Sequence, residues 1–265
     1  MKLIKFTSCQ APTMDPVCQA LTTYIGERLP QDVRVQFMGD IPWQERFRQL
    51  DADNIQIAWI CGSHYVRRFD QAAAKLELLA APVWRAERYQ GKPVYYSDVV
   101  VHRDSPFQTF ADLQGATWAY NEPGSLSGYE VMRHHLAKLG ETAQFFGQMV
   151  EAGAHQQSLQ MILAQQVDVS AIDSTVLEQA LQARPELAEQ LRIIEVLGPS
   201  PMPPWVVTQS VPLELRMAIR TLLTKMHENP AGQSILAQGS ISHFAPVTDA
   251  DYDPVRQMLA AAEQI

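Results

Sequence analysis

The sequence predicts an α/β fold of two lobes, each with a mixed β-sheet flanked by helices. Residues 3–60 alternate strand, helix, strand, helix and strand patterns, which is the order expected for a sheet covered by helices. A second alternation of strands and helices begins after residue 103. Because ligands bind beyond the carboxyl ends of the strands in such sheets, we expect a ligand cleft between the two lobes.

In the first lobe, strands are expected where apolar residues alternate or run continuously, and helices where they recur at helical spacing. Asp15-Pro16 and Pro42-Trp43 are typical helix starts, and Asn229-Pro230 ends the helix that Pro212 begins. The expected strands are residues 3–8, 33–37, 55–60, 76–83, 95–101 and 205–208. The expected helices are residues 15–29, 43–50, 212–226, 231–238 and 254–263, with a shorter helical piece from His64.

The second lobe is expected as an insertion into the first. The chain crosses into it after His102 and returns along residues 191–197. Its strands are expected at residues 115–120, 145–150, 167–172 and 191–197, and its helices after Thr109, Ser127, Gly153 and Asp173. The predicted domains are residues 1–102 with 196–265 for the first lobe, and residues 103–195 for the second.

The turn after the first strand of the second lobe carries the strongest functional signal. It reads Glu122-Pro-Gly-Ser-Leu-Ser-Gly-Tyr-Glu130 and leads into a helix that Gly140 ends. Ser127 and Glu130 have the spacing of a capping box, which predicts Ser127 as the N-cap. The free N–H groups of the first helical turn, with the hydroxyls of Ser125 and Ser127, favour an oxyanion site. The alternative is a helix cap without a ligand.

Composition limits the class of partner. The chain has 265 residues, of which 46% are hydrophobic and 19% charged, and this is typical of a globular protein. Its formal net charge is −8 and no local cluster of Lys and Arg reverses it, so nucleic acid is excluded as a partner. A small anion is compatible with this charge, because helix-end and hydroxyl donors act at contact range.

Cofactor, metal and membrane signals are weak or absent in the sequence. The cysteines are Cys9, Cys18 and Cys61, an odd number without paired spacing, so we expect small buried hydrophobes and no disulfide framework. No glycine pattern for a dinucleotide or a phosphate loop occurs, and no metal or cofactor is predicted. No stretch approaches the roughly 20 apolar residues of a membrane span. Met1 leads directly into the first expected strand, which leaves no room for a secretory leader.

Three motifs, taken in order, resemble the substrate-binding proteins of phosphonate, phosphite and phosphate ABC transporters. They are Gly124-Ser-Leu-Ser-Gly-Tyr129, Gly153-Ala-His-Gln-Gln-Ser158 and Val167-Asp-Val-Ser-Ala-Ile-Asp-Ser174. Further similar segments are Ile60-Cys-Gly-Ser-His-Tyr-Val66, Arg103-Asp-Ser-Pro-Phe107, Asp112-Leu-Gln-Gly115 and Pro199-Ser-Pro-Met-Pro-Pro204. The resemblance spans about residues 55–210. It implies the type II periplasmic binding fold, in which two lobes close on an oxyanion.

The resemblance also implies roles for the matching residues. Ser125, Ser127 and the N–H groups near Gly128 would hold phosphoryl-type oxygens, with His155 as a further donor. Asp173 would accept a proton and so favour a monoanion that still carries a hydrogen. Trp43, Tyr65 and either Tyr95 or Tyr96 would form the wall of the first lobe. The expected ligand-binding set is Ser125, Leu126, Ser127, Gly128, Tyr129, His155, Asp173, Tyr65, Tyr95 and Trp43.

The function implied is that of a monomeric periplasmic solute-binding protein, not an enzyme, that delivers a small oxyanion to an ABC permease. Leu126 departs from the pattern, because phosphonate binders often carry a third hydroxyl at this position. One alternative is a cytosolic enzyme on the same fold, similar to the lyases of the alternative menaquinone route, with Asp173 or His155 as acid or base. Another is a ligand sensor. Asp173 and His155 also fit simple helix caps, and His134-His135 is expected to be solvated.

Overall fold

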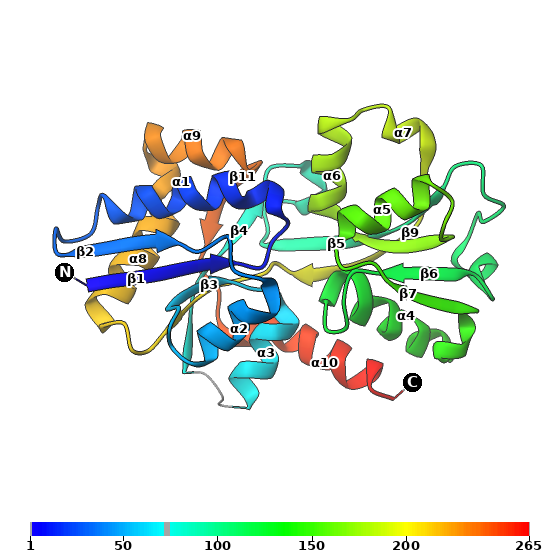
Figure 1. Ribbon diagram of the computed structural model, residues 1–265, viewed down its shortest axis with the longest axis horizontal. Helices are drawn as coiled ribbons and strands as arrows, with labels where there is room; N and C mark the ends of the chain where they lie inside the picture. Colours follow the sequence, from blue (N-terminus) through cyan, green and yellow to red (C-terminus); the bar gives the residue numbers. More distant parts are fainter. Residues whose placement is uncertain (1, 72–74, 265) are drawn as a thin grey trace. The chain divides into compact units, whose positions relative to one another are not determined.

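The computed structural model describes residues 2–71 and 75–264, and the chain forms two compact units. The first unit runs up to Val94 and resumes over Pro201–Tyr252, and the second comprises Tyr95–Ser200 and the segment from Asp253 onward. Each unit contains a β-sheet with helices packed on it (Figure 1). The two strands that connect the units, β5 (Val94–His102) and β9 (Leu191–Pro201), therefore belong almost wholly to the second unit.

The sheet of the first unit is mixed, with the strand order β11-β4-β10-β3-β1-β2. β1 pairs in parallel with β2 and β3, so the carboxyl ends of these three strands meet at one edge. β10 runs antiparallel to both β3 and β4, and β11 antiparallel to β4. The strands are β1 Lys2–Ser8, β2 Val33–Phe37, β3 Ile57–Trp59, β4 Leu76–Trp84, β10 Trp205–Thr208 and β11 Ile241–Ala245.

Helices of the first unit begin largely at the residues that their capping chemistry predicts. Pro42 and Pro212 are the N-caps of α2 and α8, and the Asn229 side chain accepts the Gly232 N–H at the start of α9. The α-helices are α1 Asp15–Gly26, α2 Trp43–Asp51, α3 Gly62–Asp70, α8 Leu213–Lys225 and α9 Pro230–Gln238. Short 3₁₀ helices cover Pro12–Met14, Glu87–Tyr89, Met226–Glu228 and Asp249–Tyr252.

The sheet of the second unit has the order β7-β6-β8-β5-β9. β6 pairs in parallel with β7 and β8, while β5 runs antiparallel to β8. The strands are β5 Val94–His102, β6 Thr117–Tyr120, β7 Gln148–Glu151, β8 Val169–Asp173 and β9 Leu191–Pro201. The helices are α4 Val131–Leu139, α5 His155–Leu163, α6 Ser174–Ala183, α7 Leu187–Gln190 and α10 Asp253–Ala262, with 3₁₀ turns at Phe110–Leu113 and Ala143–Phe145.

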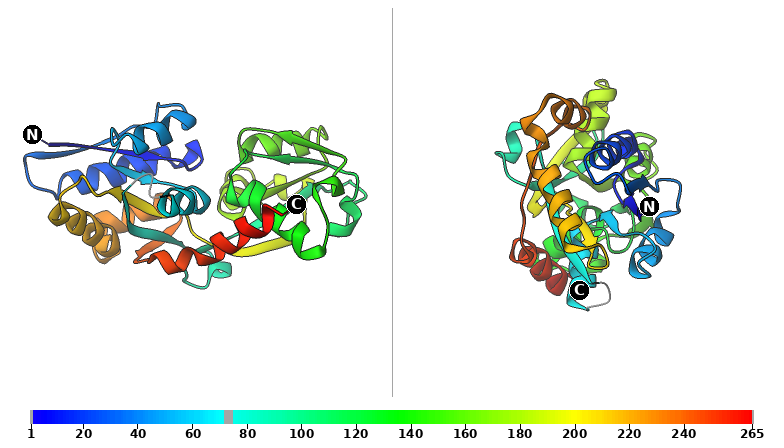
Figure 2. Two further views of the ribbon diagram at one scale, coloured as in Figure 1. Left: turned by 90° about the horizontal axis from the view of Figure 1, so that it is seen from below. Right: turned by 90° about the vertical axis from the view of Figure 1, so that its left-hand side faces the viewer.

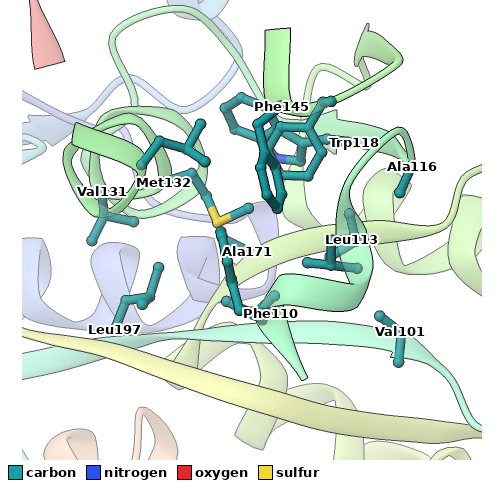
Figure 3. Packing of buried hydrophobic residues seen from close by; sticks show 14 residues of the cluster. Val101, Phe110, Leu113, Ala116, Trp118, Val131, Met132, Phe145, Ala171 and Leu197 are labelled. Carbon is teal, nitrogen blue, oxygen red and sulfur yellow. The ribbon is translucent and has the colours of Figure 1, made fainter. Parts of the chain in front are cut away.

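Both faces of the second sheet are buried, as the near-continuous apolar runs of its strands indicate. Along β5, Val99 and Val101 enter one hydrophobic cluster while Val100 enters another. The first cluster includes Trp118, residues of α4 and a group of phenylalanines (Figure 3). The second is closed by α5, α6 and α7, which Figure 1 shows across the sheet from α4. The sheet is therefore a rigid support for the turns at its edge.

The C-terminal helix α10 belongs to the second unit and not, as the sequence predicts, to the first. The sequence assigned residues 196–265 to the first lobe, whereas α10 packs against α4 of the second unit (Figure 2). Its buried side chains are Val255, Leu259 and Ala262. An apolar stripe at this spacing predicts a helix with one covered face, but the spacing alone does not say which element covers it.

Candidate functional site

The serine turn, residues 124–128, connects β6 to α4, and its cap lies two residues earlier than the sequence predicts. Ser125 is the N-cap: its hydroxyl accepts the Gly128 N–H at 3.2 Å, and its carbonyl accepts the N–H groups of Tyr129 and Glu130. The capping box expected between Ser127 and Glu130 is therefore wrong. The reason is a π-helical turn over Leu126–Glu130, which widens the helix start and takes Ser127 inside it.

Because Ser127 is not the cap, its hydroxyl is available to another partner. Ser127 Oγ lies 2.8 Å from His155 Nε2. His155 is the first residue of α5, and the strands before the two residues, β6 and β7, are parallel neighbours. The pair thus joins two helix starts at the carboxyl edge of the sheet. Either atom can donate, since the imidazole tautomer decides which one carries the proton.

Backbone donors surround the Ser127–His155 pair. Among the described residues, the N–H groups of Leu126 and Ser127 have no backbone hydrogen bond, as expected at the start of a helix. The first N–H groups of α5 are also available, because no side chain in the described part of the chain caps the start of this helix. Ser125 and Ser127 are 4% and 6% exposed, so their hydroxyls are largely removed from water. Buried neutral donors of this kind favour an oxyanion without the help of Lys or Arg.

Gly128 permits the close approach of three segments at this turn. A Cβ at this position would lie 2.0 Å from Asn121 Oδ1 and 3.0 Å from His155 Cε1, so a larger residue would require the Asn121 side chain to shift. Asn121 follows β6 directly, and its buried Oδ1 has no hydrogen-bond partner in the part of the chain that the structure describes. Sequence reasoning missed Asn121, although its place at the carboxyl end of a parallel strand was a usable signal.

Asp173 ends β8 and caps α6. Its Oδ1 accepts the Thr175 N–H at 2.8 Å and the Thr175 hydroxyl at 2.7 Å, which is the helix-cap role left open by the sequence. β8 also packs against the π-helical turn. Burial raises the pKa of Asp173 to about 6 and Asp98 adds to the rise, while hydrogen bonds from Thr175 and Val176 lower it.

Two further groups have displaced pKa values. Burial lowers the pKa of His155 to about 4, and the Ala171 backbone opposes this shift. His155 is therefore neutral near pH 7. Burial, and secondly the Glu151 carboxylate, raise the pKa of Glu122 to about 8. Glu122 begins the segment singled out in the sequence, but its own protonation was not foreseen.

The remaining expected residues have other surroundings. Tyr129 is half-buried and stacks on Trp118, with ring centroids 5.6 Å apart. Tyr65 is 1% exposed and its hydroxyl donates to Asp249 at 2.9 Å. The other placements are Leu126 fully buried, Tyr95 buried on β5 of the second unit, and Trp43 at the start of α2 against Phe47 and His64.

Comparison with known proteins identifies the family. Residues 6–252 match the family model described as "ABC transporter, phosphonate, periplasmic substrate-binding protein". The chain belongs to this family. The expected resemblance is thereby confirmed, and the family is one of transport substrate-binding proteins rather than of enzymes.

Individual relatives of this phosphonate-binding family agree. The chain is 24% identical over 254 residues to the phosphonates-binding periplasmic protein of Escherichia coli (strain K12), covering 93% of this chain and 71% of that protein. A binding protein of a Pseudomonas aeruginosa ABC phosphonate transporter matches with TM-score 0.84 and 21% identity, covering 99% and 87% of the two chains. A Prochlorococcus marinus (MIT 9301) protein in complex with methylphosphonate matches with TM-score 0.86 and 14% identity, covering 100% and 99%. These structures confirm the type II periplasmic binding fold.

Other features of this family member concern metals and membranes. In residues 2–71 and 75–264, no group of three or more His, Cys, Asp or Glu side chains is arranged to hold a metal ion. Within the same ranges, none of the helices combines the length and apolar character needed to cross a membrane. Of the cysteines, Cys18 is buried as expected, whereas Cys9 and Cys61 are partly exposed.

Proposed function

We propose that this protein binds a small phosphonate-type oxyanion at the serine turn and delivers it, in the periplasm, to an ABC permease. The observation that carries the proposal is the 2.8 Å contact between Ser127 Oγ and His155 Nε2, which unites the starts of α4 and α5. Membership of the phosphonate family supports the class of ligand. The relative in complex with methylphosphonate makes that compound a natural first probe.

The chemistry of the turn is that of a neutral donor set. A ligand oxygen would accept from the N–H groups of Leu126 and Ser127 and from the Ser127 hydroxyl, whose proton is available when His155 Nε2–H donates to Ser127 Oγ. α4 and α5 both follow parallel strands, so their starts lie at the same edge of the sheet and both helix dipoles would favour an anion there. Because these donors are fixed before the ligand arrives, binding requires little reordering.

Asp173 supports a preference for the protonated form of the ligand. A buried carboxylate close to a dianion costs free energy, whereas a monoanion that keeps one hydrogen can donate it to the carboxylate. Methylphosphonate and phosphite monoanions meet this condition, and phosphate meets it in its monobasic form. The choice among them remains a prediction, as does ligand contact by Trp43 and Tyr65. Tyr95 belongs to the second unit, so the expectation that it forms part of the first-lobe wall is wrong.

Thermal unfolding with added anions tests the proposal. We expect methylphosphonate to raise the melting temperature, because a ligand that binds only the folded state stabilises it by mass action. Phosphate, phosphite, sulfate and acetate at the same concentration and ionic strength rank the specificity. Equal shifts for all five anions, or none for methylphosphonate, would refute the proposal. Light scattering of the same samples tests the expected monomer.

A further inference from the structure

A groove lies in the second unit, between α4, α10 and the end of β9. It has a volume of about 300 Å³, which is at the lower limit for small-molecule pockets, and all its lining residues belong to this unit. One wall is the α4 face formed by Val131, His134, His135 and Lys138. These residues are spaced i, i+3, i+4 and i+7, so they share one side of the helix. None of the ten expected ligand-binding residues lines this groove.

Mostly apolar residues form the other walls of the groove, and the Gln257 amide is the one polar side chain among them. α10 contributes Pro254, Gln257 and Met258, again at i, i+3 and i+4. Leu197 and Pro199 of β9 close the third side. Figure 3 shows Leu197 and Val131 on the same side of the hydrophobic cluster, so the floor of the groove is continuous with the core.

The two histidines are half-buried, which corrects the expectation that they are solvated. His134 Nδ1 is buried without a hydrogen-bond partner among the described residues. The His135 ring packs edge to face on Phe110, with centroids 4.4 Å apart. Burial lowers the pKa of both imidazoles, with further lowering by Lys138, while the Glu195 carboxylate raises that of His135.

The charge of the residues that line the groove favours a ligand with one negative charge. Lys138 at the rim carries the only full positive charge among the lining residues. The imidazoles and the Gln257 amide can donate hydrogen bonds, and the other lining residues are apolar apart from Gly198. One ammonium group suits one negative charge. A dianion would require more cations, and a neutral hydrocarbon would make no use of the Lys138 charge.

We propose that this groove is a second binding site, which takes a small organic carboxylate with a short apolar body. The carboxylate lies between Lys138 and the imidazoles of His134 and His135. The apolar body packs on Val131, Leu197 and Met258. The site is distinct from the serine turn and does not depend on the proposed transport ligand.

Nuclear magnetic resonance of the imidazole C–H groups, with benzoate as the probe, tests this site. The chain has seven histidines, and single His→Gln variants assign their signals. We expect benzoate to move the signals of His134 and His135 in a saturable manner and to leave His155 unmoved. Methylphosphonate should do the reverse. Failure of the methylphosphonate arm alone would count against the proposed function and not against this groove.

Lys138→Gln gives the decisive comparison, since this exposed side chain can be changed without loss of folding. We expect the variant to weaken benzoate binding about tenfold, as loss of a charge-assisted hydrogen bond does. Lys138→Arg should retain binding, and Lys225→Gln, on α8 of the first unit, is the matched control. No shift of His134 and His135, an equal shift of all histidines, or unchanged affinity in Lys138→Gln would each overturn the proposal.

Discussion

At the serine turn, two hydroxyls two residues apart have different roles. Ser125 holds the helix start through the Gly128 N–H, while Ser127 pairs with His155. The difference follows from the π-helical turn, which places the first residue at the cap and the second beyond it. Stability and ligand affinity should therefore respond separately to changes at the two serines.

Ser125→Ala should lower the free energy of unfolding by about 1 kcal/mol, because it removes an N-cap acceptor. Ser125→Thr keeps an acceptor and should restore most of this loss. Urea denaturation followed by circular dichroism measures both. The opposite pattern would contradict this assignment: an unchanged free energy of unfolding in Ser125→Ala, a loss in Ser127→Ala and no loss in Ser127→Thr. Ser127 would then be the N-cap, as in the capping box, and the π-helical turn would be wrong.

Asp173→Asn should change how stability depends on pH. The folded-state pKa of Asp173 is raised from 3.8 to about 6, so the folded state holds more protons between these values and stability is lost as pH rises through about 6. Asparagine also caps helices but does not titrate. From about pH 4 to pH 8, the wild type should lose up to about 3 kcal/mol relative to the variant. A constant difference across this range would contradict the raised pKa.

At the scale of elements, the turn is built by contact between segments that are distant in sequence. Gly128 lies against Asn121 from the end of β6 and against His155 from the start of α5. A side chain at residue 128 would therefore press on the Asn121 side chain and the His155 ring. The local sequence shows only that residue 128 is a glycine, whereas the packing shows that the glycine makes room for Asn121 and His155.

Gly128→Ala should destabilise the protein by about 1 to 3 kcal/mol, because the new methyl group overlaps Asn121 Oδ1. Gly26→Ala is the control, since a Cβ there would have no atom closer than 3.8 Å. Combining Gly128→Ala with Asn121→Ala removes the overlap and should recover part of the loss. Strict additivity of the two changes in a double-mutant cycle would show that the residues do not interact.

Most elements could be predicted from local pattern, and the exceptions depend on tertiary contact. The helix starts at Pro42, Pro212 and Asn229 follow from capping chemistry. β11 was missed, because its short polar-apolar alternation is weak without β4 beside it. The π-helical turn was missed because local spacing favours a capping box. Asn121 was missed because its relevance comes from Gly128, seven residues later.

For the whole molecule, net charge and site chemistry act in opposite directions. The formal charge of −8 repels an anion at long range, whereas the site that we propose at the serine turn would attract it at contact. The membership of the family fixes the fold and the general role, and the resemblance seen in three motifs was sufficient to predict both. Family membership does not determine which anion is bound, because this choice depends on the atoms of the binding site.

Affinity for methylphosphonate should therefore change little with salt. Screening weakens the repulsion by the net charge, and hydrogen bonds from buried neutral donors are hardly screened. Titration calorimetry at about 20 mM and about 300 mM NaCl should give dissociation constants within about twofold of each other. A loss of affinity by tenfold at high salt would instead indicate binding by exposed Lys or Arg.

The most direct test of the central claim is calorimetric titration of methylphosphonate into the wild type and Ser127→Ala, with exposed Ser242→Ala as the matched control. Removal of a buried donor to an oxyanion should weaken binding about tenfold or more in Ser127→Ala and leave Ser242→Ala unchanged. Equal affinity in all three proteins would contradict the claim that the serine turn holds the ligand.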